Sequence, residues 1–344
     1  MGQALERIPL TRKVGRIRDV ARETGLSTAT ISRVMNGAGN VTADTRARVL
    51  DACSRLNYLP NPAARALSTR KSRTIAAIIP SIEHSIYAKF ISAIEKRLAL
   101  RGYSLVLAVS NGSETDELAA ARKLLGMGAE ALILSGAAHS SELNDLLARR
   151  GVPHAFTSVW DPESSVPTIG YDNETLARDA IRFIAGKGHK KIAVVHGPTA
   201  ESDRTRARTT GAEAGRSDKT VVDVFECRLD VPGGKAAANR VLRAGTDYTA
   251  IFCFSDILAL GVYFALIERG ITIPDAMSVM GFDNLDWTGA VVPGLTTINI
   301  PATKMGFDVA DQLILHLEDG EPVAPTKVDG WIVERGSVVE PPGS

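Results

Sequence analysis

The chain has 344 residues, of which 44% are hydrophobic and 23% are charged, a composition typical of a soluble globular protein but too long for one ordinary domain core. Its formal net charge of +1 hides an uneven distribution, because residues 1–73 hold 14 Lys and Arg against 5 Asp and Glu, whereas the remainder holds 26 against 34. A basic segment ahead of an acidic body indicates binding to a polyanion, and a solvated charged face is the alternative.

Cysteine usage and the N-terminus bear on the compartment. Cys53, Cys227 and Cys253 are far apart and form no Cys-x-x-Cys pair, so neither a disulfide framework nor a zinc site is indicated. The N-terminus has no apolar signal core, and no later window is long and uncharged enough to cross a bilayer. We therefore expect a cytoplasmic protein that does not associate with membranes.

Two short helices are predicted near the start of the chain. Residues 17–24 carry an apolar face and stop before Gly25, which stands where a left-handed C-terminal cap belongs. Ser27 is a good N-cap for the second helix. The apolar face of that helix consists of Ile31, Val34 and Met35. Small polar residues are left on its outer face.

A third helix is predicted to begin after the N-cap Thr42 and to end near Asn57. Its buried stripe consists of Val49, Ala52, Cys53 and Leu56. Two helices joined by a glycine turn and braced by a third are typical of a helix-turn-helix, whose second helix reads bases in the major groove. Short hydroxyl side chains would let the backbone approach DNA, and Arg33 can reach guanine or phosphate. The alternative is a three-helix bundle without a ligand.

Residues 57–74 follow as a turn, a short segment with Asn61 as N-cap, and a basic linker. A helix this short is not stable alone in water, so we expect it to order when it binds. Leu67, flanked by Arg65 and Arg70, is suited to wedge open a minor-groove base step while the arginines contact phosphates. An ordinary linker leucine is the rival interpretation.

From Thr74 onward, apolar runs alternate with helical stretches. The predicted buried strands are T-I-A-A-I-I-P, Y-S-L-V-L-A-V-S, A-L-I-L-S, P-H-A-F-T-S, K-I-A-V-V-H-G, A-I-F-C-F-S and S-V-M-G-F-D. The predicted covering helices span residues 87–101, 115–126, 173–187 and 256–269. This alternation predicts doubly wound parallel sheets, and its restart near Val166 predicts two similar lobes.

The chain resembles the lactose-repressor (LacI/GalR) family of bacterial transcription regulators from about Ile17 to its C-terminus. The matching motifs are I-R-D-V-A-R-E-T-G-L-S-T-A-T-I-S-R-V-M-N-G, V-T-A-D-T-R-A-R-V-L, N-Y-L-P-N-P-A-A-R-A-L, Y-D-N, G-H-K-K-I-A, P-D-A-M-S-V-M-G-F-D-N and L-T-T-I. The resemblance implies an all-α helix-turn-helix DNA-binding domain with a hinge helix. An α/β periplasmic-binding-protein-like body of two doubly wound parallel-sheet lobes would follow, with a small molecule between the lobes.

The expected domain boundaries follow from the elements and the resemblance together. They are a basic and disordered arm at 1–16, a DNA-binding domain at 17–60, a hinge helix and linker at 61–73, and an effector-binding and dimerisation domain at 74–344. Within the last domain we expect lobe 1 at about 74–165 and 293–320, and lobe 2 at about 166–292 and 321–340. The predicted DNA-binding residues are Ser27, Thr28, Ala29, Thr30, Ser32, Arg33, Asn36, Asn40, Thr42, Thr45, Tyr58, Asn61, Arg65 and Leu67.

Candidate effector residues lie just past strand ends, where open α/β sheets bind ligands. The resemblance implies a ligand clamp at Arg208, stacking at Ile86 and Tyr87, and a polar contact at Asp283. Where relatives usually carry an aspartate, this chain has Ser158. The full predicted set is Ser81, Ile86, Tyr87, Ser158, Ser202, Arg204, Arg208, Ser255, Asp283 and Trp287. For each of these residues the alternative is a solvated polar group at a strand end.

The function predicted on these grounds is that of a transcriptional repressor. It would bind a near-palindromic operator in double-stranded DNA as a homodimer, because the C-terminal V-V-E-P-P-G-S carries no heptads for a tetramer. A sugar or sugar derivative is the favoured effector, and a nucleobase or another metabolite is the alternative. An enzyme is disfavoured because hydrolase, metalloprotease and phosphate-loop motifs are absent, and we expect neither cofactor nor metal. A transport binding protein would leave residues 17–73 unexplained.

Overall fold

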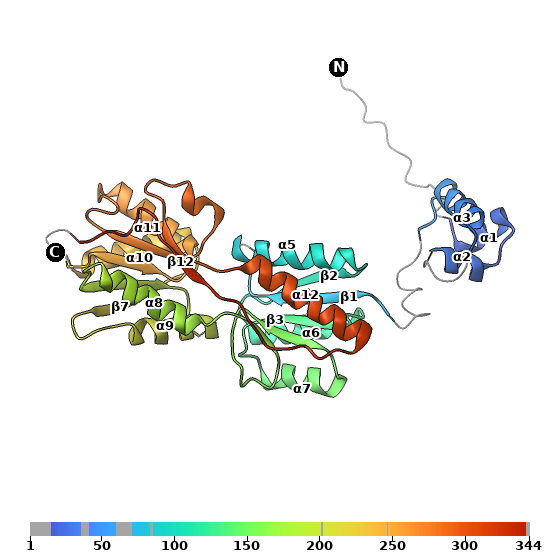
Figure 1. Cartoon of the computed structure of the whole chain (residues 1–344), viewed down its shortest axis with the longest axis horizontal. Coiled ribbons are helices and arrows are strands. Elements are labelled where there is room, and N and C mark those ends of the chain that lie inside the picture. The colour runs from blue at the N-terminus through green and yellow to red at the C-terminus, as the bar shows by residue number, and fades with distance from the viewer. Residues whose placement is uncertain are drawn as a thin grey trace, which may run out of the picture. The chain divides into compact units, whose positions relative to one another are not determined.

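The computed structural model of the chain describes residues 15–35, 41–59, 71–82, 85–200, 202–245 and 247–341 (Figure 1). The chain divides into two compact units, Met1–Ser72 and Arg73–Ser344. The described residues of the first unit form helices and turns, whereas the second unit combines two β-sheets with covering helices.

The first unit contains the helices predicted from local signals. They are α1 (Ile17–Thr24), α2 (Thr28–Met35) and α3 (Ala43–Arg55). Gly25 ends α1 in the left-handed conformation, with φ of 68°, and Thr42 caps α3 through its side chain. The buried core of this unit consists of Val20, Ile31, Val34, Val49, Ala52 and Cys53. The predicted apolar faces of all three helices are therefore confirmed.

Lobe 1 of the second unit is built on an entirely parallel sheet. Its strands, in spatial order, are β11 (Thr326–Lys327), β5 (Thr168–Gly170), β4 (His154–Thr157), β3 (Ala131–Ser135), β1 (Thr74–Ile79) and β2 (Ser104–Val109). The covering helices are α5 (Ser85–Leu100), α6 (Glu114–Gly126), α7 (Ser141–Arg150) and α12 (Ala302–Asp319). Along β1, Ile75 and Ala77 join the core under α5 and α12, while Ala76 and Ile78 join the core under α6 and α7. Burial on both faces explains why this strand is a continuous apolar run.

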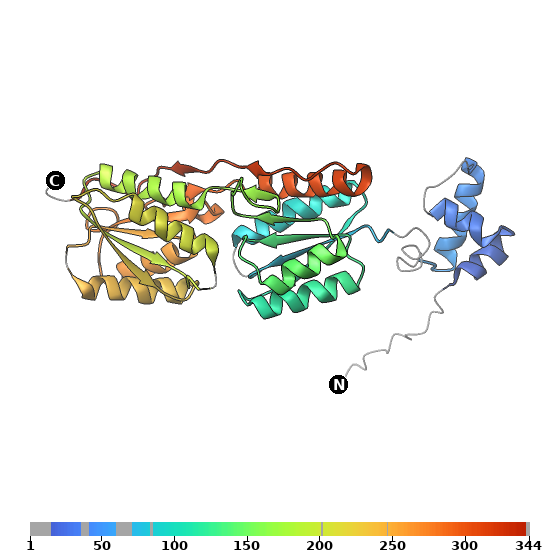
Figure 2. The same cartoon turned by 90° about the horizontal axis from the view of Figure 1, so that it is seen from below.

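Lobe 2 repeats the architecture with one antiparallel edge strand, β12. The strands in spatial order are β12 (Trp331–Val333), β10 (Thr296–Asn299), β9 (Ser278–Asp283), β8 (Ala250–Cys253), β6 (Lys191–His196) and β7 (Val221–Glu226). Its helices are α8 (Asn173–Gly186), α9 (Asp203–Ala214), α10 (Val231–Ala244), α11 (Asp256–Glu268) and the short 3₁₀ helix η1 (Asp286–Gly289). Figure 2 shows helices above and below each sheet. The expected pair of doubly wound lobes is thus present.

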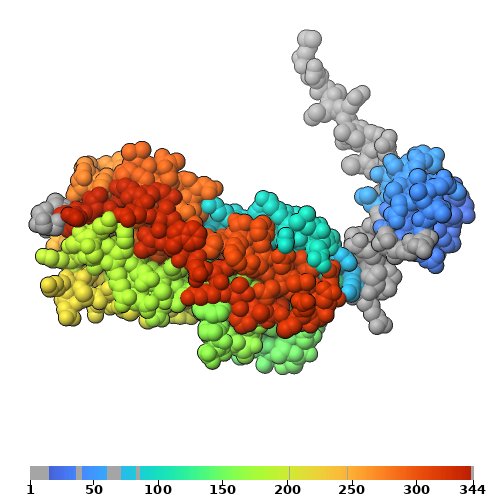
Figure 3. Space-filling view, viewed as in Figure 1, coloured from blue at the N-terminus to red at the C-terminus, as the bar shows by residue number. Residues whose placement is uncertain are grey.

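The chain crosses between the lobes at different residues from those expected. The boundaries predicted at 165–166, 292–293 and 320–321 each fall too early. Strands β5 and β11 hydrogen-bond in the sheet of lobe 1, and β10 belongs to lobe 2, so the crossings follow β5, β10 and β11. Strands of two to four residues give no readable hydrophobic pattern, and only their pairing assigns them to a sheet. In the space-filling view the C-terminal segment, coloured red, covers surface on both lobes (Figure 3).

Within the described parts of the chain, no helix has both the length and the apolar character that spanning a bilayer requires. The same residues contain no group of three or more His, Cys, Asp or Glu side chains placed to hold a metal ion. The three cysteines are unpaired thiols, and Cys53 and Cys253 are buried.

Candidate DNA-binding helix and ligand pocket

Helix α2 presents one apolar and one polar face. Ile31 and Val34 are buried in the core of the unit, while Thr28, Ala29 and Arg33 are exposed. The remaining predicted contacts on this face are exposed Ser27 and partly buried Thr30 and Ser32. The outer face is therefore composed of side chains short enough for a close approach to DNA, with one long cation.

The N-terminus of α2 is fixed by Ser27. Its hydroxyl accepts a hydrogen bond from the backbone N–H of Thr30 at 3.1 Å and contacts the Thr30 hydroxyl at 2.9 Å. Ser27 therefore acts as the predicted N-cap, and its side chain also lies beside the predicted reading surface. A base or phosphate contact by this hydroxyl would have to compete with its capping bond.

The start of α3 is capped in the same way. Thr42 accepts from the backbone N–H of Thr45 at 3.3 Å and donates to the Thr45 hydroxyl at 2.9 Å. Thr42 is exposed and Thr45 is partly buried, so both remain candidates for phosphate contacts. Tyr58 is partly buried, and its ring packs against the core of the unit.

Helix α3 also braces the other two helices. The Arg48 guanidinium donates to the backbone carbonyl of Thr24 at the end of α1, at 2.8 Å, and Arg46 donates to the carbonyl of Val34 in α2, at 3.5 Å. These arginines occupy carbonyls that the helix ends leave unpaired. The predicted contacts Asn36, Asn40, Asn61, Arg65 and Leu67 lie outside the described residues.

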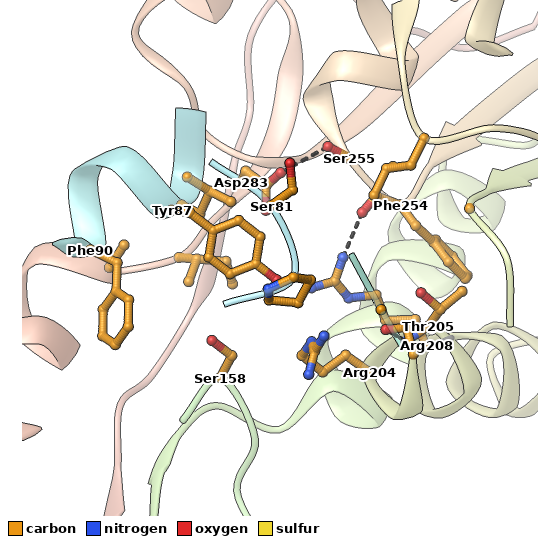
Figure 4. A pocket seen from close by; sticks show the side chains of 18 of the residues that line it. Ser81, Tyr87, Phe90, Ser158, Arg204, Thr205, Arg208, Phe254, Ser255 and Asp283 are labelled. Atoms are coloured by element: carbon orange, nitrogen blue, oxygen red, sulfur yellow. Dashed lines mark hydrogen bonds between the residues drawn. The ribbon is translucent and has the colours of Figure 1, made fainter. Parts of the chain in front are cut away.

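The second unit contains a pocket of about 300 Å³ between the two lobes (Figure 4). Its lining residues follow strand ends in both lobes, for example Ser81 after β1, Ser158 after β4, Ser255 after β8 and Asp283 at the end of β9. Parallel strands bring their carboxyl ends to one edge, which is why residues so distant in sequence converge there. The predicted residues that line the pocket are Ser81, Ile86, Tyr87, Ser158, Ser202, Arg204, Arg208, Ser255 and Asp283.

Trp287 differs from the prediction because it does not line this pocket. It lies in η1, and its ring packs against the apolar core of lobe 2. This packing depends on the fold around η1, and no local sequence pattern reveals it. The lining also includes residues that the sequence did not suggest, among them Phe90, Asn111, Tyr171 and Phe254.

Arg208 is held in place by four neighbours. Its guanidinium donates to the Asn173 side-chain oxygen at 2.9 Å, to the Tyr171 hydroxyl at 3.4 Å and to the Phe254 backbone carbonyl. It also lies over the Phe282 ring, 3.6 Å from the ring centroid. The planar cation is thus oriented before any ligand arrives, which reduces the entropy lost on binding.

A buried carboxyl group faces this arginine from the end of β9. Asp283 has φ of 120°, is only 6% exposed and accepts a hydrogen bond from Ser255 at 3.0 Å. Burial raises the pKa of the Asp283 carboxyl, and attraction to Arg208 opposes that rise. Asp256, which sequence reasoning missed, is fully buried and accepts from the Thr297 hydroxyl at 2.6 Å. Burial, and then repulsion from Asp283, raise its pKa as well.

Asp203 connects the two lobes, and it too was missed from sequence. It begins α9 in lobe 2 and accepts hydrogen bonds from the backbone N–H groups of Ala137 and Ala138 in lobe 1, at 2.6 and 3.1 Å. Its other oxygen accepts from the N–H and the guanidinium of Arg204, at 2.8 and 3.1 Å. Burial raises the Asp203 pKa, but Arg204 and these N–H groups outweigh it, so the pKa lies below its usual value.

Comparison with known proteins identifies the fold. Residues 16–61 match the sequence pattern of the family described as bacterial regulatory proteins, lacI family. Residues 72–327 match the pattern described as periplasmic binding proteins and sugar binding domain of LacI family. The chain belongs to the LacI family.

Several curated relatives align over most of this LacI-family chain. Catabolite control protein A of Priestia megaterium is 32% identical over 89% of this chain and 93% of that protein. The HTH-type transcriptional repressor PurR of Photobacterium profundum is 32% identical over 88% and 92%, and the repressor CytR of Escherichia coli K12 is 30% identical over 93% and 95%. These relatives are regulators, so the chain is a DNA-binding transcriptional regulator rather than an enzyme, as predicted.

Solved structures agree with this assignment. The lac repressor dimer bound to operator and the anti-inducer ONPF is 26% identical, with a TM-score of 0.84 over 95% of this chain and 100% of that chain. The transcriptional regulator CelR–cellobiose complex is 26% identical, with a TM-score of 0.68 over 94% and 99%. The predicted fold class, a helix-turn-helix unit followed by a periplasmic-binding-protein-like body, is confirmed.

Proposed function

We propose that this LacI-family regulator binds a near-palindromic operator as a homodimer and that a sugar or sugar derivative in the pocket changes its affinity for DNA. The compartment that fits such a function is the cytoplasm. The observation that supports the proposal is that both lobes contribute residues to the pocket. Ser81 and Tyr87 come from lobe 1, and Arg208 and Asp283 come from lobe 2. A ligand that contacts both lobes binds their closed arrangement more tightly than an open one, and that difference in affinity can shift a conformational equilibrium.

The dimeric operator complex is supported by the lac repressor structure, which is a dimer bound to operator. In a two-fold dimer, two copies of α2 would face two half-sites of related sequence. Ser27, Thr28, Ala29, Thr30, Ser32 and Arg33 would contact the major groove and its phosphates. The effector class is supported by the CelR–cellobiose complex, since the ligand of that protein is a saccharide.

The proposed pocket is tested by mutation of its central arginine. An operator is first selected from random duplexes with the full-length protein, and small molecules are screened by thermal shift, because a bound ligand stabilises the fold by mass action. A stabilising ligand should change operator affinity in wild-type protein and fail to do so in Arg208→Ala. A variant that responds to the ligand as wild type does would remove Arg208 from the effector site.

The proposed wedge is tested separately on DNA. Leu67→Ala should weaken binding to the selected operator more than binding to random duplex, because unstacking a base step supports only the specific complex. Gel-shift titrations on both duplexes measure the two affinities. An equal loss on both DNAs would contradict the wedge and leave Leu67 as a linker residue.

A further inference from the structure

The described residues that line the pocket include more cationic than anionic side chains. Among its lining residues, the side chains that ordinarily carry full charge are Arg204, Arg208 and Asp283. Arg204 and Arg208 are four residues apart on α9, so they project from the same face of that helix. In Figure 4 Arg204 and Ser158 lie at one side of the pocket, and Asp283 with Ser255 lies at the opposite side. The pocket therefore has a cationic end and an acidic, hydroxyl-bearing end.

The charge of Arg208 has no ionic partner within the described residues. No carboxylate there lies within 4.0 Å of its nitrogens, and its acceptors are the neutral oxygens of Asn173, Tyr171 and Phe254. Neutral acceptors satisfy the geometry of a guanidinium but do not neutralise its charge, and the nearby Asp283 carboxylate attracts Arg208 without forming an ion pair with it. Because the group is partly buried in a concave site, that charge favours an anion more strongly than it would at an open surface.

Arg204 is only partly neutralised. It is 9% exposed, and within the described residues its single close carboxylate is that of Asp203, at 3.1 Å. The same carboxylate also accepts three backbone N–H groups, those of Ala137, Ala138 and Arg204 itself. These donors hold the Asp203 carboxylate toward the backbone of lobe 1, and Asp203 does not line the pocket. The Arg204 guanidinium also forms a side-chain hydrogen bond with Tyr87, which lines the pocket, so an anion would bind Arg204 beside Tyr87 or in its place.

The acid at the opposite end does not restore neutrality. Asp283 already accepts from Ser255, and one carboxylate, whose pKa burial raises to about 6, cannot balance two guanidinium groups. Ser158 supplies a hydroxyl rather than a second carboxylate next to the arginines. Among the described residues, the pocket lining thus carries more positive than negative charge, and both cations lie on α9.

We propose that the effector is an anionic sugar derivative, whose carboxylate or phosphate is bound jointly by Arg204 and Arg208 and whose hydroxyl groups contact Ser255 and Asp283. This inference rests on the proposed function, since it specifies the ligand of the same pocket. A volume of about 300 Å³ lies at the small end of ligand sites and suits a single sugar ring or its open-chain acid. A neutral sugar could accept hydrogen bonds from both guanidinium groups, but it would bury the charge of Arg208 without supplying a counter-ion, which is unfavourable.

The first test compares acids with their neutral counterparts on the full-length protein. The carboxylate probes are D-gluconate, D-glucuronate and D-galacturonate, the phosphate probe is D-glucose 6-phosphate, and the neutral probes are D-sorbitol, D-glucose and D-galactose. Thermal shift and calorimetric titration should show at least one acid that binds about tenfold or more tightly than its neutral counterpart. The carboxylate and phosphate arms show which anion is preferred.

Two results would overturn the inference: neutral sugars that bind as tightly as the acids, or no binding by any acid of the panel. A neutral sugar that binds and controls operator affinity would overturn the anionic ligand and leave the proposed function intact. An acid that binds but does not change operator affinity would overturn the proposed function and leave the anionic ligand intact. The two failures are therefore distinguishable.

The second test removes one charge at a time. Arg204→Gln should weaken acid binding by about tenfold or more and weaken the binding of the neutral counterpart by clearly less, while Arg204→Lys should retain part of the preference. Arg206→Gln is the matched control, because Arg206 lies on the same helix but is exposed and outside the pocket lining. The affinity of Arg206→Gln for the acid should stay within about twofold of the wild-type affinity. Equal losses for acid and neutral ligands in Arg204→Gln, with an unchanged circular dichroism spectrum, would show a structural role and overturn the inference.

Discussion

The contact between Asp203 and lobe 1 can be tested without knowledge of the ligand. In Asp203→Asn, one neutral oxygen replaces a carboxylate that accepts from the N–H groups of Ala137 and Ala138 at 2.6 and 3.1 Å. Hydrogen bonds to a charged group contribute about 1.5–3 kcal/mol each, and a neutral bond contributes about 1 kcal/mol. With allowance for rehydration of the carboxylate when the lobes separate, we expect closure to weaken by about 2 kcal/mol. That difference corresponds to about thirtyfold in the ratio of closed to open molecules.

Hydrogen exchange measures this change directly. The amides of Ala137 and Ala138 exchange only when the contact opens, so their exchange should accelerate by up to the same factor of about thirty in Asp203→Asn. The matched control is Asp218→Asn, which removes a charge from an exposed loop of the same lobe and should leave both amides unchanged. If the two amides exchange within about twofold of the wild-type rate in Asp203→Asn, the carboxylate does not hold the lobes together.

Three further changes test other parts of the structure. Arg33→Ala should reduce the slope of log affinity against log salt concentration on random duplex by about one if Arg33 contacts a phosphate, and an unchanged slope in anisotropy titrations would exclude that contact. Gly211→Ala should destabilise the protein by about 1–3 kcal/mol in urea unfolding, because the added Cβ would lie 2.0 Å from the Glu174 carbonyl oxygen. Gly186→Ala should leave the stability unchanged, because no atom lies within 4 Å of the Cβ added there. The raised pKa of Asp256 means that the folded state binds a proton that the unfolded state has lost. Stability should therefore fall as pH rises from about 4 to about 8, and Asp256→Asn should make that slope smaller, with the contribution of Asp283 remaining. Equal slopes in both proteins would refute this reasoning.

Much of the helix-turn-helix unit could be predicted because its signals are local. The cap at Ser27, the glycine at Gly25 and the cap at Thr42 act within three or four residues of their own positions. The same holds for central strands such as β1, whose apolar run follows from burial on both faces. These features depend on local backbone preferences and on hydrophobic pattern, both of which can be recognised from the residue types in the sequence.

Helix α9 shows where such patterns fail. Its sequence, D-R-T-R-A-R-T-T-G-A-E-A, contains no apolar side chain larger than alanine, so no hydrophobic stripe predicts it. It is held against α8 by close backbone contact at Gly211. The helix that carries both pocket arginines was consequently absent from the predicted elements. Arg208 was predicted from a family motif, and its neighbours Asn173 and Tyr171 were not.

The sequence by itself determined the class of protein, the order of its parts and most residues at the strand ends that form the pocket. Tertiary structure alone decided which of those residues share a contact. It packed the partly buried Trp287 against the core of lobe 2 and joined Asp203 to Ala137, 66 residues away. Sequence could not show that contact because the donors are backbone N–H groups, which nearly every residue type possesses, and only the path of the folded chain directs them toward one carboxylate.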